Sequence, residues 1–246
     1  FRRVLFRSSQ EGVGLYQTTI NKARRWSSAR AYLKDAKRRK NLTVATSAHA
    51  TRLIIENGRA AGVEYLTPDG TRTARARREV VVSGGVYGSP QLLMLSGLGP
   101  AEHLKKMGIE VVRDMPGVGS NLHDHFNTYI AYKCSQPVTM NDLVNSLPRR
   151  LWAGMQYALG RTGPLASMGL YVGAFVRSDR RFERPDLQIN MFAWAIKTRD
   201  RNGVVAQPFS AFGLSPVHLR PDGRGTVRLK SSDRSEEHTS ELQSHH

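Results

Sequence analysis

The sequence has a single cysteine, Cys134, among its 246 residues. A lone cysteine excludes an internal disulfide framework and any zinc site built on cysteine ligands, and we interpret Cys134 as a small core residue. No apolar run approaches the roughly 18 residues that a membrane-spanning helix needs. The first ten residues contain three arginines and no apolar block follows them, so no secretory signal peptide is predicted there.

Acidic residues are scarce as well. The chain has 37 Lys and Arg against 20 Asp and Glu, which gives a net charge of +17, and basic residues crowd into residues 24–40. Such a segment could attract nucleic acid or an acidic surface. No recognition motif accompanies the charge, so we favour a solvated helix face and expect no nucleic-acid partner. A basic binding module without catalysis stays open as the alternative.

The two ends of the chain look foreign. Residues 1–8 read FRRVLFRS and residues 234–241 read RSEEHTSE. One oligonucleotide, read in opposite orientations, can encode both stretches, and it resembles a common DNA-sequencing adapter. We therefore set residues 1–8 and 234–246 aside as foreign ends, and we expect residues 9–233 to be an internal fragment of a longer protein.

Hydrophobic periodicity and turn residues predict the elements of the first half. Asn57-Gly58 and Asp69-Gly70 are turn signals between β-branched runs, which indicates a three-stranded meander. The valine run before Ser83 predicts a strand buried on both faces, as in a parallel sheet. The full expectation is helices at 22–40, 89–95 and 101–107, with strands at 42–46, 51–56, 62–66, 71–78, 79–83 and 108–112.

The second half is predicted to be mostly antiparallel sheet. Residues 140–160 read as helical with a break at Pro148, and the strands are expected at 126–133, 170–176, 187–197, 211–219 and 225–230. The change of character near His123 predicts a boundary between residues 9–122 and residues 123–233. The fold class is therefore α/β followed by α+β.

The stretch VVVSGGVYGSPQLLMLSGLGP, residues 80–100, is the main candidate for chemistry. A strand, a glycine turn and a helix form the geometry in which a nucleotide phosphate meets a helix N-terminus, with Ser89 as the expected N-cap. The Gly-Gly-x-x-Gly spacing differs from the dinucleotide fingerprint Gly-x-Gly-x-x-Gly. On spacing alone, a tight packing corner, or a nicotinamide-dependent dehydrogenase that uses this turn, stays open.

Several collinear segments resemble one family. SPQLLMLSGLGP resembles the second signature of the glucose–methanol–choline (GMC) flavin oxidoreductases. RWSSARAYL (25–33), NLTVATSAHATRLIIENGRAAGVEY (41–65) and GIEVVRDMPGVGSNLHDH (108–125) resemble the family's neighbouring segments in the same order. HLRPDGRGTVRLKSSD (218–233) is similar to part of its substrate domain, and choline-dehydrogenase-like members are the nearest.

The resemblance implies FAD as the cofactor and hydride transfer from the CH–OH group of a small alcohol. It implies a partial FAD-binding domain at 9–122 and a partial substrate-binding domain at 123–233. Ser83, Gly84 and Gly85 would lie against the ADP half of FAD, and the backbone of Ala50 would contact the adenine. The family's first glycine motif and its catalytic histidine segment match nothing here, so no residue is assigned a catalytic role. The fragment is expected to be inactive alone, and the electron acceptor, oxygen or a quinone, is not assigned.

Two further groups have a bland and a functional interpretation. His123, Asp124 and His125 are metal-ligand types, but neighbouring side chains in an extended segment point to opposite faces, so we expect no metal. The resemblance implies instead a loop between domains near the cofactor. Phe192 and Trp194 are predicted to share one strand face, which is sheet core or, by resemblance, a pocket wall; we favour core.

Overall fold

The computed structural model describes residues 10–167, 169–200, 203–233 and 240–245. The contacts divide the chain into two compact units, and each is described by itself. Unit 1 comprises residues 1–42 and 125–221, and unit 2 comprises residues 43–124 and 222–246. Among the described residues, no helix has the length and apolar character needed to cross a bilayer.

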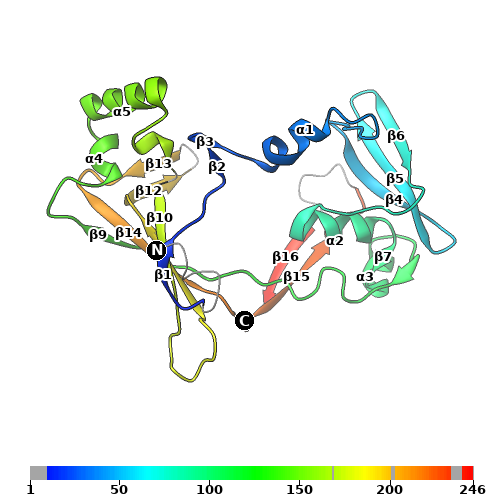
Figure 1. The fold of residues 1–246 in the computed structure, drawn as a ribbon. Helices are drawn as coiled ribbons and strands as arrows, with labels where there is room; N and C mark the ends of the chain where they lie inside the picture. The colour runs from blue at the N-terminus through cyan, green and yellow to red at the C-terminus, as the bar shows by residue number, and fades with distance from the viewer. Residues whose placement is uncertain (1–9, 168, 201–202, 234–239, 246) are drawn as a thin grey trace. The chain divides into compact units, whose positions relative to one another are not determined.

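Unit 1 is built on a five-stranded antiparallel sheet with the order β1-β10-β11-β14-β9 (Figure 1). At its centre, Asn190 lies opposite Gly173 on one side and Ser215 on the other. The strands are β1 (Gly12–Leu15), β9 (Ile130–Lys133), β10 (Leu170–Val176), β11 (Leu187–Phe192) and β14 (Ala211–His218). β10 and β14 match predicted strands closely, whereas β1 was not predicted.

Two tyrosines cover glycines on this sheet. A methyl group added to Gly173 would overlap the ring of Tyr16, and one added to Gly213 would overlap the ring of Tyr129. The Tyr16 hydroxyl donates to Asn190 Oδ1 at 2.6 Å and accepts from Gln188 Nε2 at 2.7 Å. Glycine is therefore required at both positions for the hydroxyl end of each tyrosine ring to lie against the strand.

The connection from β10 to β11 is fixed by a buried aspartate. The carboxylate of Asp186 accepts hydrogen bonds from the Ser178 backbone N–H at 2.7 Å and from the Ser178 hydroxyl at 2.5 Å. These bonds to Ser178 hold the pKa of Asp186 below its usual range. The hydrogen bonds between Ser178 and Asp186 therefore close the connection where β10 ends and β11 begins.

Helices and a small hairpin flank the sheet of unit 1. The predicted helix 140–160 is interrupted at Asn145-Ser146, and Pro148 stands in the first turn of the second helix, where its missing N–H costs nothing. The predicted strand 187–197 ends at Phe192, because the chain bends and re-enters a separate hairpin. These elements are α4 (Met140–Val144), α5 (Leu147–Gly160), the 3-10 turn Pro164–Ala166, β12 (Ile196–Asp200) and β13 (Gly203–Ala206).

The predicted helix 22–40 is wrong in its first third. Lys22 and Ala23 have φ angles of 49° and 56°, which form a tight turn between β2 (Ile20–Asn21) and β3 (Arg24–Arg25). Helix begins only at Ala29, as a π-helical turn Ala29–Leu33 followed by α1 (Lys34–Ala36). The high helix propensity of Lys, Arg and Ala is overridden by strand pairing.

Unit 2 contains the predicted meander as a three-stranded sheet, β4-β5-β6. Asn57 and Gly58 both have positive φ angles, 50° and 73°, as a two-residue hairpin turn requires. The strands are β4 (His49–Glu56), β5 (Arg59–Thr67) and β6 (Gly70–Arg75). The strand predicted at 42–46 does not form, and the chain there is irregular.

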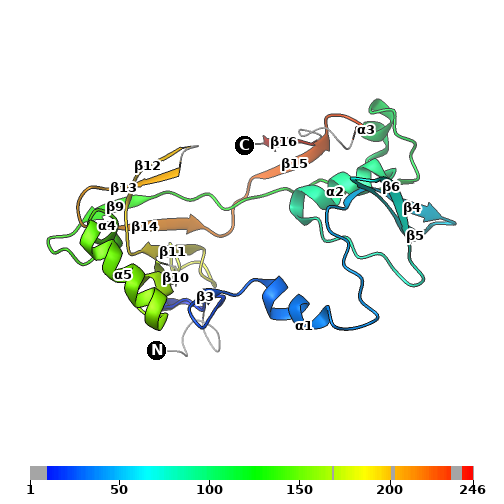
Figure 2. The same cartoon turned by 90° about the horizontal axis from the view of Figure 1, so that it is seen from above.

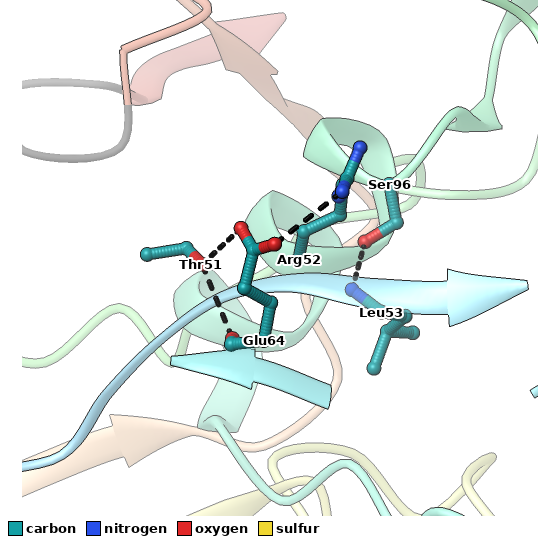
Figure 3. A network of polar contacts seen from close by, with 5 residues as sticks. All are labelled: Thr51, Arg52, Leu53, Glu64 and Ser96. Atoms are coloured by element: carbon teal, nitrogen blue, oxygen red, sulfur yellow. Dashed lines mark hydrogen bonds and ion pairs between the residues drawn. The ribbon is translucent and has the colours of Figure 1, made fainter. Parts of the chain in front are cut away.

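Helix α2 (Gly85–Leu95) is joined to β4 by one buried serine (Figure 3). Ser96 Oγ accepts the Leu53 backbone N–H at 2.8 Å and donates to the Leu92 carbonyl at 2.6 Å. Nearby, Thr51 and Arg52 both bond the Glu64 carboxylate across the sheet. The serine satisfies a buried strand N–H and fixes the end of the helix on the sheet.

Replacing Ser96 by Ala should destabilise unit 2. The substitution leaves the buried Leu53 N–H without its acceptor, which costs about 1–3 kcal/mol of unfolding free energy. Faster amide exchange at Leu53, together with urea unfolding, measures the effect. Ser89→Ala, at a partly exposed position on the same helix, is the control, with a change expected within about 0.5 kcal/mol.

The core of unit 2 lies between α2 and the first strand of the unit's second segment, residues 222–246. Met94, Leu104 and Leu229 form its buried cluster. The elements around it are α3 (Ala101–Lys106), the parallel pair β7 (Leu98–Gly99) and β8 (Arg113–Asp114), and the antiparallel pair β15 (Arg224–Leu229) and β16 (Ser240–His245) (Figure 2). The strand predicted at 108–112 is thus shifted to Arg113. β16 lies in the end that was set aside as foreign.

The predicted buried strand 79–83 is also wrong. Val80 to Ser83 have no regular secondary structure and pair with no strand among the described residues, and Val81 is 75% exposed. A valine run is buried on both faces only where strands flank it on both sides, and the described chain supplies none. The division into domains at residue 122 stays a prediction.

Candidate functional site

The turn that enters α2 forms an open, glycine-lined helix start. Gly84 is the N-cap residue and Gly85 has φ +76°, so the helix begins four residues before the predicted N-cap, Ser89. No side chain caps this end, and the first turn holds no acidic residue. The first N–H groups of the helix therefore lack helical acceptors and favour an anionic ligand.

Two of the glycines at this turn are required for different reasons. A methyl group on Gly84 would come within 2.9 Å of the Gly88 carbonyl carbon and the Ser89 nitrogen. A methyl group on Gly85 would meet nothing within 4 Å, but its positive φ strains any L side chain. The space beside Gly85 stays free of protein atoms, so a ligand can approach the backbone there.

A hollow of about 300 Å³ lies along the same helix, one turn further on. Its walls come from α2, from the loop that resembles the family segment 108–125, and from β15, all within unit 2. Its principal lining residues are Val86, Ser89, Leu93, Ser120, Leu122 and Val227. Asn121 and His123 line it as well, and the surface is mostly apolar with a few polar groups.

Arg228 holds the loop that forms one wall of this hollow. Its guanidinium donates to the Val118 carbonyl at 3.0 Å and to the Ser120 hydroxyl at 3.2 Å. The Val227 N–H donates to the Gly119 carbonyl at 2.7 Å, and Leu122 exchanges backbone hydrogen bonds with Gly225. The loop therefore runs along β15 almost as an added strand.

His103 connects α3 to the same strand. Its Nε2 accepts the Leu229 backbone N–H at 3.1 Å, so the imidazole must be neutral at that nitrogen. Burial lowers the pKa of His103, and the positive charges of Arg228 and Lys106 lower it further. The bond exists only while the ring is unprotonated.

Unit 2 should lose stability as pH falls. Because the folded-state pKa of His103 lies below the unfolded value of about 6.5, its contribution is complete above that pH and declines as pH falls toward the folded pKa. Urea midpoints measured between pH 7.5 and pH 5, near the ordinary His range, should decrease for the chain and change less for His103→Gln. Equal pH dependence in both proteins would contradict this assignment.

The other residues singled out in the sequence are placed as follows. Ala50 lies on β4 opposite Tyr65. The hydrogen bond from the Leu53 N–H to Ser96 Oγ holds the same strand against the C-terminal end of α2. Trp194 lies beyond the end of β11, so alternation does not place it beside Phe192 as predicted. Phe192 instead pairs with Tyr129, with ring centroids 6.1 Å apart, and the Tyr129 hydroxyl donates to the Trp194 carbonyl. Phe192 and Trp194 are both half-buried.

The His-Asp-His segment lies at the surface of unit 2 and at the start of unit 1. His123 Nδ1 lies 3.0 Å from the Asn121 carbonyl oxygen, and all three side chains are exposed. Among the residues that the structure describes, no cluster of three or more His, Cys, Asp or Glu could hold a metal ion.

Comparison with known proteins identifies the family of this chain. Residues 3–127 match the family model described as GMC oxidoreductase. The chain belongs to the GMC oxidoreductase family. This confirms the resemblance that was inferred from its motifs, and the predicted fold class agrees with the helices and antiparallel sheets of this chain.

The relatives of this GMC chain are considerably longer than the chain itself. The oxygen-dependent choline dehydrogenase of Brucella ovis is 41% identical over 224 residues, which are 91% of this chain and 40% of that protein. That of Rhizobium etli is 43% identical over 229 residues, 92% of this chain and 40% of that protein. The chain therefore spans about two fifths of the length of these curated relatives.

A solved structure agrees with the same assignment. An arginine variant of the formate oxidase of Aspergillus oryzae, studied for FAD modification, matches with a TM-score of 0.78 and 26% identity over 89% of this chain and 42% of that one. The matched 89% of this chain includes residues of both units.

Sequence reasoning missed Arg228 and His103 as residues that hold the site's wall. Neither was singled out from the sequence, because a lone Arg or His carries no motif. The alternation of buried Gly225, Val227 and Leu229 along β15 places Arg228 on its other face, and this pattern was visible in the sequence.

Proposed function

We propose that this chain is part of an FAD-dependent oxidoreductase that acts on the CH–OH group of a small alcohol. The observation that carries the proposal is the uncapped, glycine-lined start of α2 in a chain of the GMC family. When bound, FAD supplies the hydride acceptor. The proposal assigns to this chain part of the cofactor's ADP side and part of the substrate pocket.

The residues at the turn fit the anionic part of such a cofactor. Ser83, Gly84 and Gly85 would hold it through backbone N–H groups at the helix start, where the helix dipole favours negative charge. The backbone of Ala50 would contact the adenine. No residue of this chain is assigned the proton transfer from the alcohol, because no histidine here matches the family's catalytic segment.

The substrate and the electron acceptor are finer proposals. The relatives' name, oxygen-dependent choline dehydrogenase, makes choline and related primary alcohols the first substrates to test, with oxygen as the first acceptor and a quinone as the second. We expect the isolated chain to be inactive, because the residues assigned above bind and position but do not transfer a proton.

A full-length chimaera tests the proposal. In it, this chain replaces the 224 matched residues of the Brucella ovis protein. We expect the purified chimaera to carry flavin, seen by its visible absorbance, and to bleach anaerobically with an alcohol. A folded chimaera without flavin, in FAD-containing buffer, would disprove the proposal.

Two glycine variants of the chimaera separate cofactor binding from backbone strain. Gly85→Ala and Gly108→Ala both place a side chain at positive φ, +76° and +69°, with no protein atom within 4 Å. Both should lose similar stability, about 1 kcal/mol. Only Gly85→Ala should also weaken flavin retention, because only its side chain would enter the space proposed for the cofactor.

A further inference from the structure

Helix α5 of unit 1 presents an apolar face to solvent. The most exposed of its side chains are Leu159 at 83% and Leu151 at 66%. Positions 147, 151, 155 and 159 follow one another at four-residue spacing, which places them along one side of a helix. The exposed apolar side chains of the helix are Leu147, Leu151, Trp152, Met155 and Leu159.

The opposite side of α5 faces the rest of unit 1. Ala153 is 2% exposed, and the half-buried Tyr157 donates its hydroxyl to the Ala23 carbonyl at 3.0 Å. Positions 151 and 153 point about 200° apart around a helix. The helix is therefore apolar on the side away from its own unit, the reverse of an ordinary surface helix.

Two arginines of α5 flank this face. Arg149 and Arg150 lie in the first turns of α5, and Arg149 lies near the Asp142 carboxylate of α4. The sequence holds no acidic residue between Asp142 and Asp179. Whatever covers the helix must therefore supply apolar side chains at its centre and negative charge at its margins.

We propose that the apolar face of α5 is covered by a polypeptide segment of the full-length protein, with an apolar face and acidic margins, from the part of the family's length that this chain does not match. The relatives extend the same fold by about three fifths of their length, so such polypeptide is available to dock there. The proposal does not depend on flavin or on the substrate.

Other occupants fit less well. A second copy of the chain would bring Arg149 and Arg150 against the same cationic helix, which is repulsive. An anionic membrane would suit the charge, but it covers a single plane. In unit 1, large apolar side chains are also exposed on β1 and β9, the two opposite edges of the sheet (Val13, Leu15, Ile130 and Tyr132). Polypeptide can cover several sides of the unit at once.

Cysteine labelling in two contexts tests the proposal. Leu159→Cys is introduced into the isolated chain and into the chimaera described above, and maleimide labelling is read by mass spectrometry of the peptide that contains position 159. Labelling in urea gives the unprotected rate. We expect the rate in the chimaera to be lower than in the isolated chain by about tenfold or more. Equal rates would overturn the proposal.

The acidic margin is tested in the same chimaera. Arg149→Glu with Arg150→Glu should restore fast labelling at position 159, whereas the matched Arg149→Lys with Arg150→Lys should leave it slow. No difference between the two pairs would contradict the acidic margin. Protection of the isolated chain by phosphatidylserine vesicles, or by its own concentration, with none in the chimaera, would assign the face to a membrane or to a second copy and overturn the proposal.

A second measurement serves if the chimaera does not accumulate. Overlapping peptides from the unmatched part of the Brucella ovis protein are arrayed and probed with the isolated chain. Binding to a few adjacent peptides that combine apolar residues with Asp or Glu is expected. Leu151→Asp with Leu159→Asp should abolish that binding, while Val138→Asp, at an equally exposed apolar position outside α5, should not. Binding insensitive to the α5 variants, or absent, would overturn the proposal.

Discussion

Replacing Asn141 by Ala should cost unit 1 about 3–5 kcal/mol of unfolding free energy. Asn141 is fully buried, and its side chain joins α4 to the start of β12 and the end of β13. Nδ2 donates to the carbonyls of Ala195 at 2.8 Å and Gln207 at 3.0 Å, and Oδ1 accepts the Ala195 N–H at 2.8 Å. Alanine leaves both backbone groups of Ala195 without these partners.

Urea unfolding and amide exchange at Ala195 measure this loss. Domains of this size have only about 5–15 kcal/mol of stability, so the variant should also accumulate poorly. Asn145→Ala is the matched control: it removes an exposed amide that also bonds the Gln207 carbonyl, at 2.7 Å, and should cost about 0.5–1.5 kcal/mol. Similar losses for the two variants would mean that burial at Asn141 contributes little.

The local signals in the sequence predicted the hairpins well. Asn57-Gly58 specifies a turn with two positive φ angles, and the strands on either side form a meander as expected. The strands at 170–176 and 211–219 also appear nearly as predicted, because alternation and turn residues define them locally.

The errors arise where distant pairing decides the structure. Residues 22–25 have the composition of a helix, yet they form a turn between two short strands. The valine run before Ser83 has the composition of a central strand, yet strands to pair with it are missing from the described residues. The composition of a segment indicates which secondary structures it can form, and the segments that pack beside it in the fold determine which one it forms.

The location of the candidate site stays a prediction, and the residues that support its wall were not predicted. The glycine turn at 83–85 carries a local signal, since helix starts and positive φ angles favour glycine. Its helix nevertheless begins at Gly85 and includes Ser89 and Pro90, because nothing caps it at the predicted residue. Arg228 and His103 act across more than 100 residues of sequence, and no spacing rule connects them to the loop that they hold.

Replacing Gly119 by Ala should disrupt the wall of the hollow beside α2. Gly119 has φ +70°, and a methyl group there would overlap the Val227 carbonyl oxygen and approach Arg228 Nη1 at 2.9 Å. The Val227 carbonyl oxygen belongs to the backbone, so no side-chain rotation can remove the overlap. The loop must therefore move away from β15 and lose its hydrogen bonds to Arg228 and Val227. Strain and overlap together should cost about 2–5 kcal/mol.

Gly117→Ala is the control for this loop. Gly117 lies two residues earlier, and a methyl group there would meet nothing within 4 Å. We expect its stability to change by less than about 0.5 kcal/mol. In the chimaera, Gly119→Ala should also lose flavin while Gly117→Ala retains it, since the loop forms one wall of the hollow along α2. If Gly119→Ala unfolded no more readily than Gly117→Ala, the loop would not lie against β15 as described, and the hollow would not be a fixed part of the site.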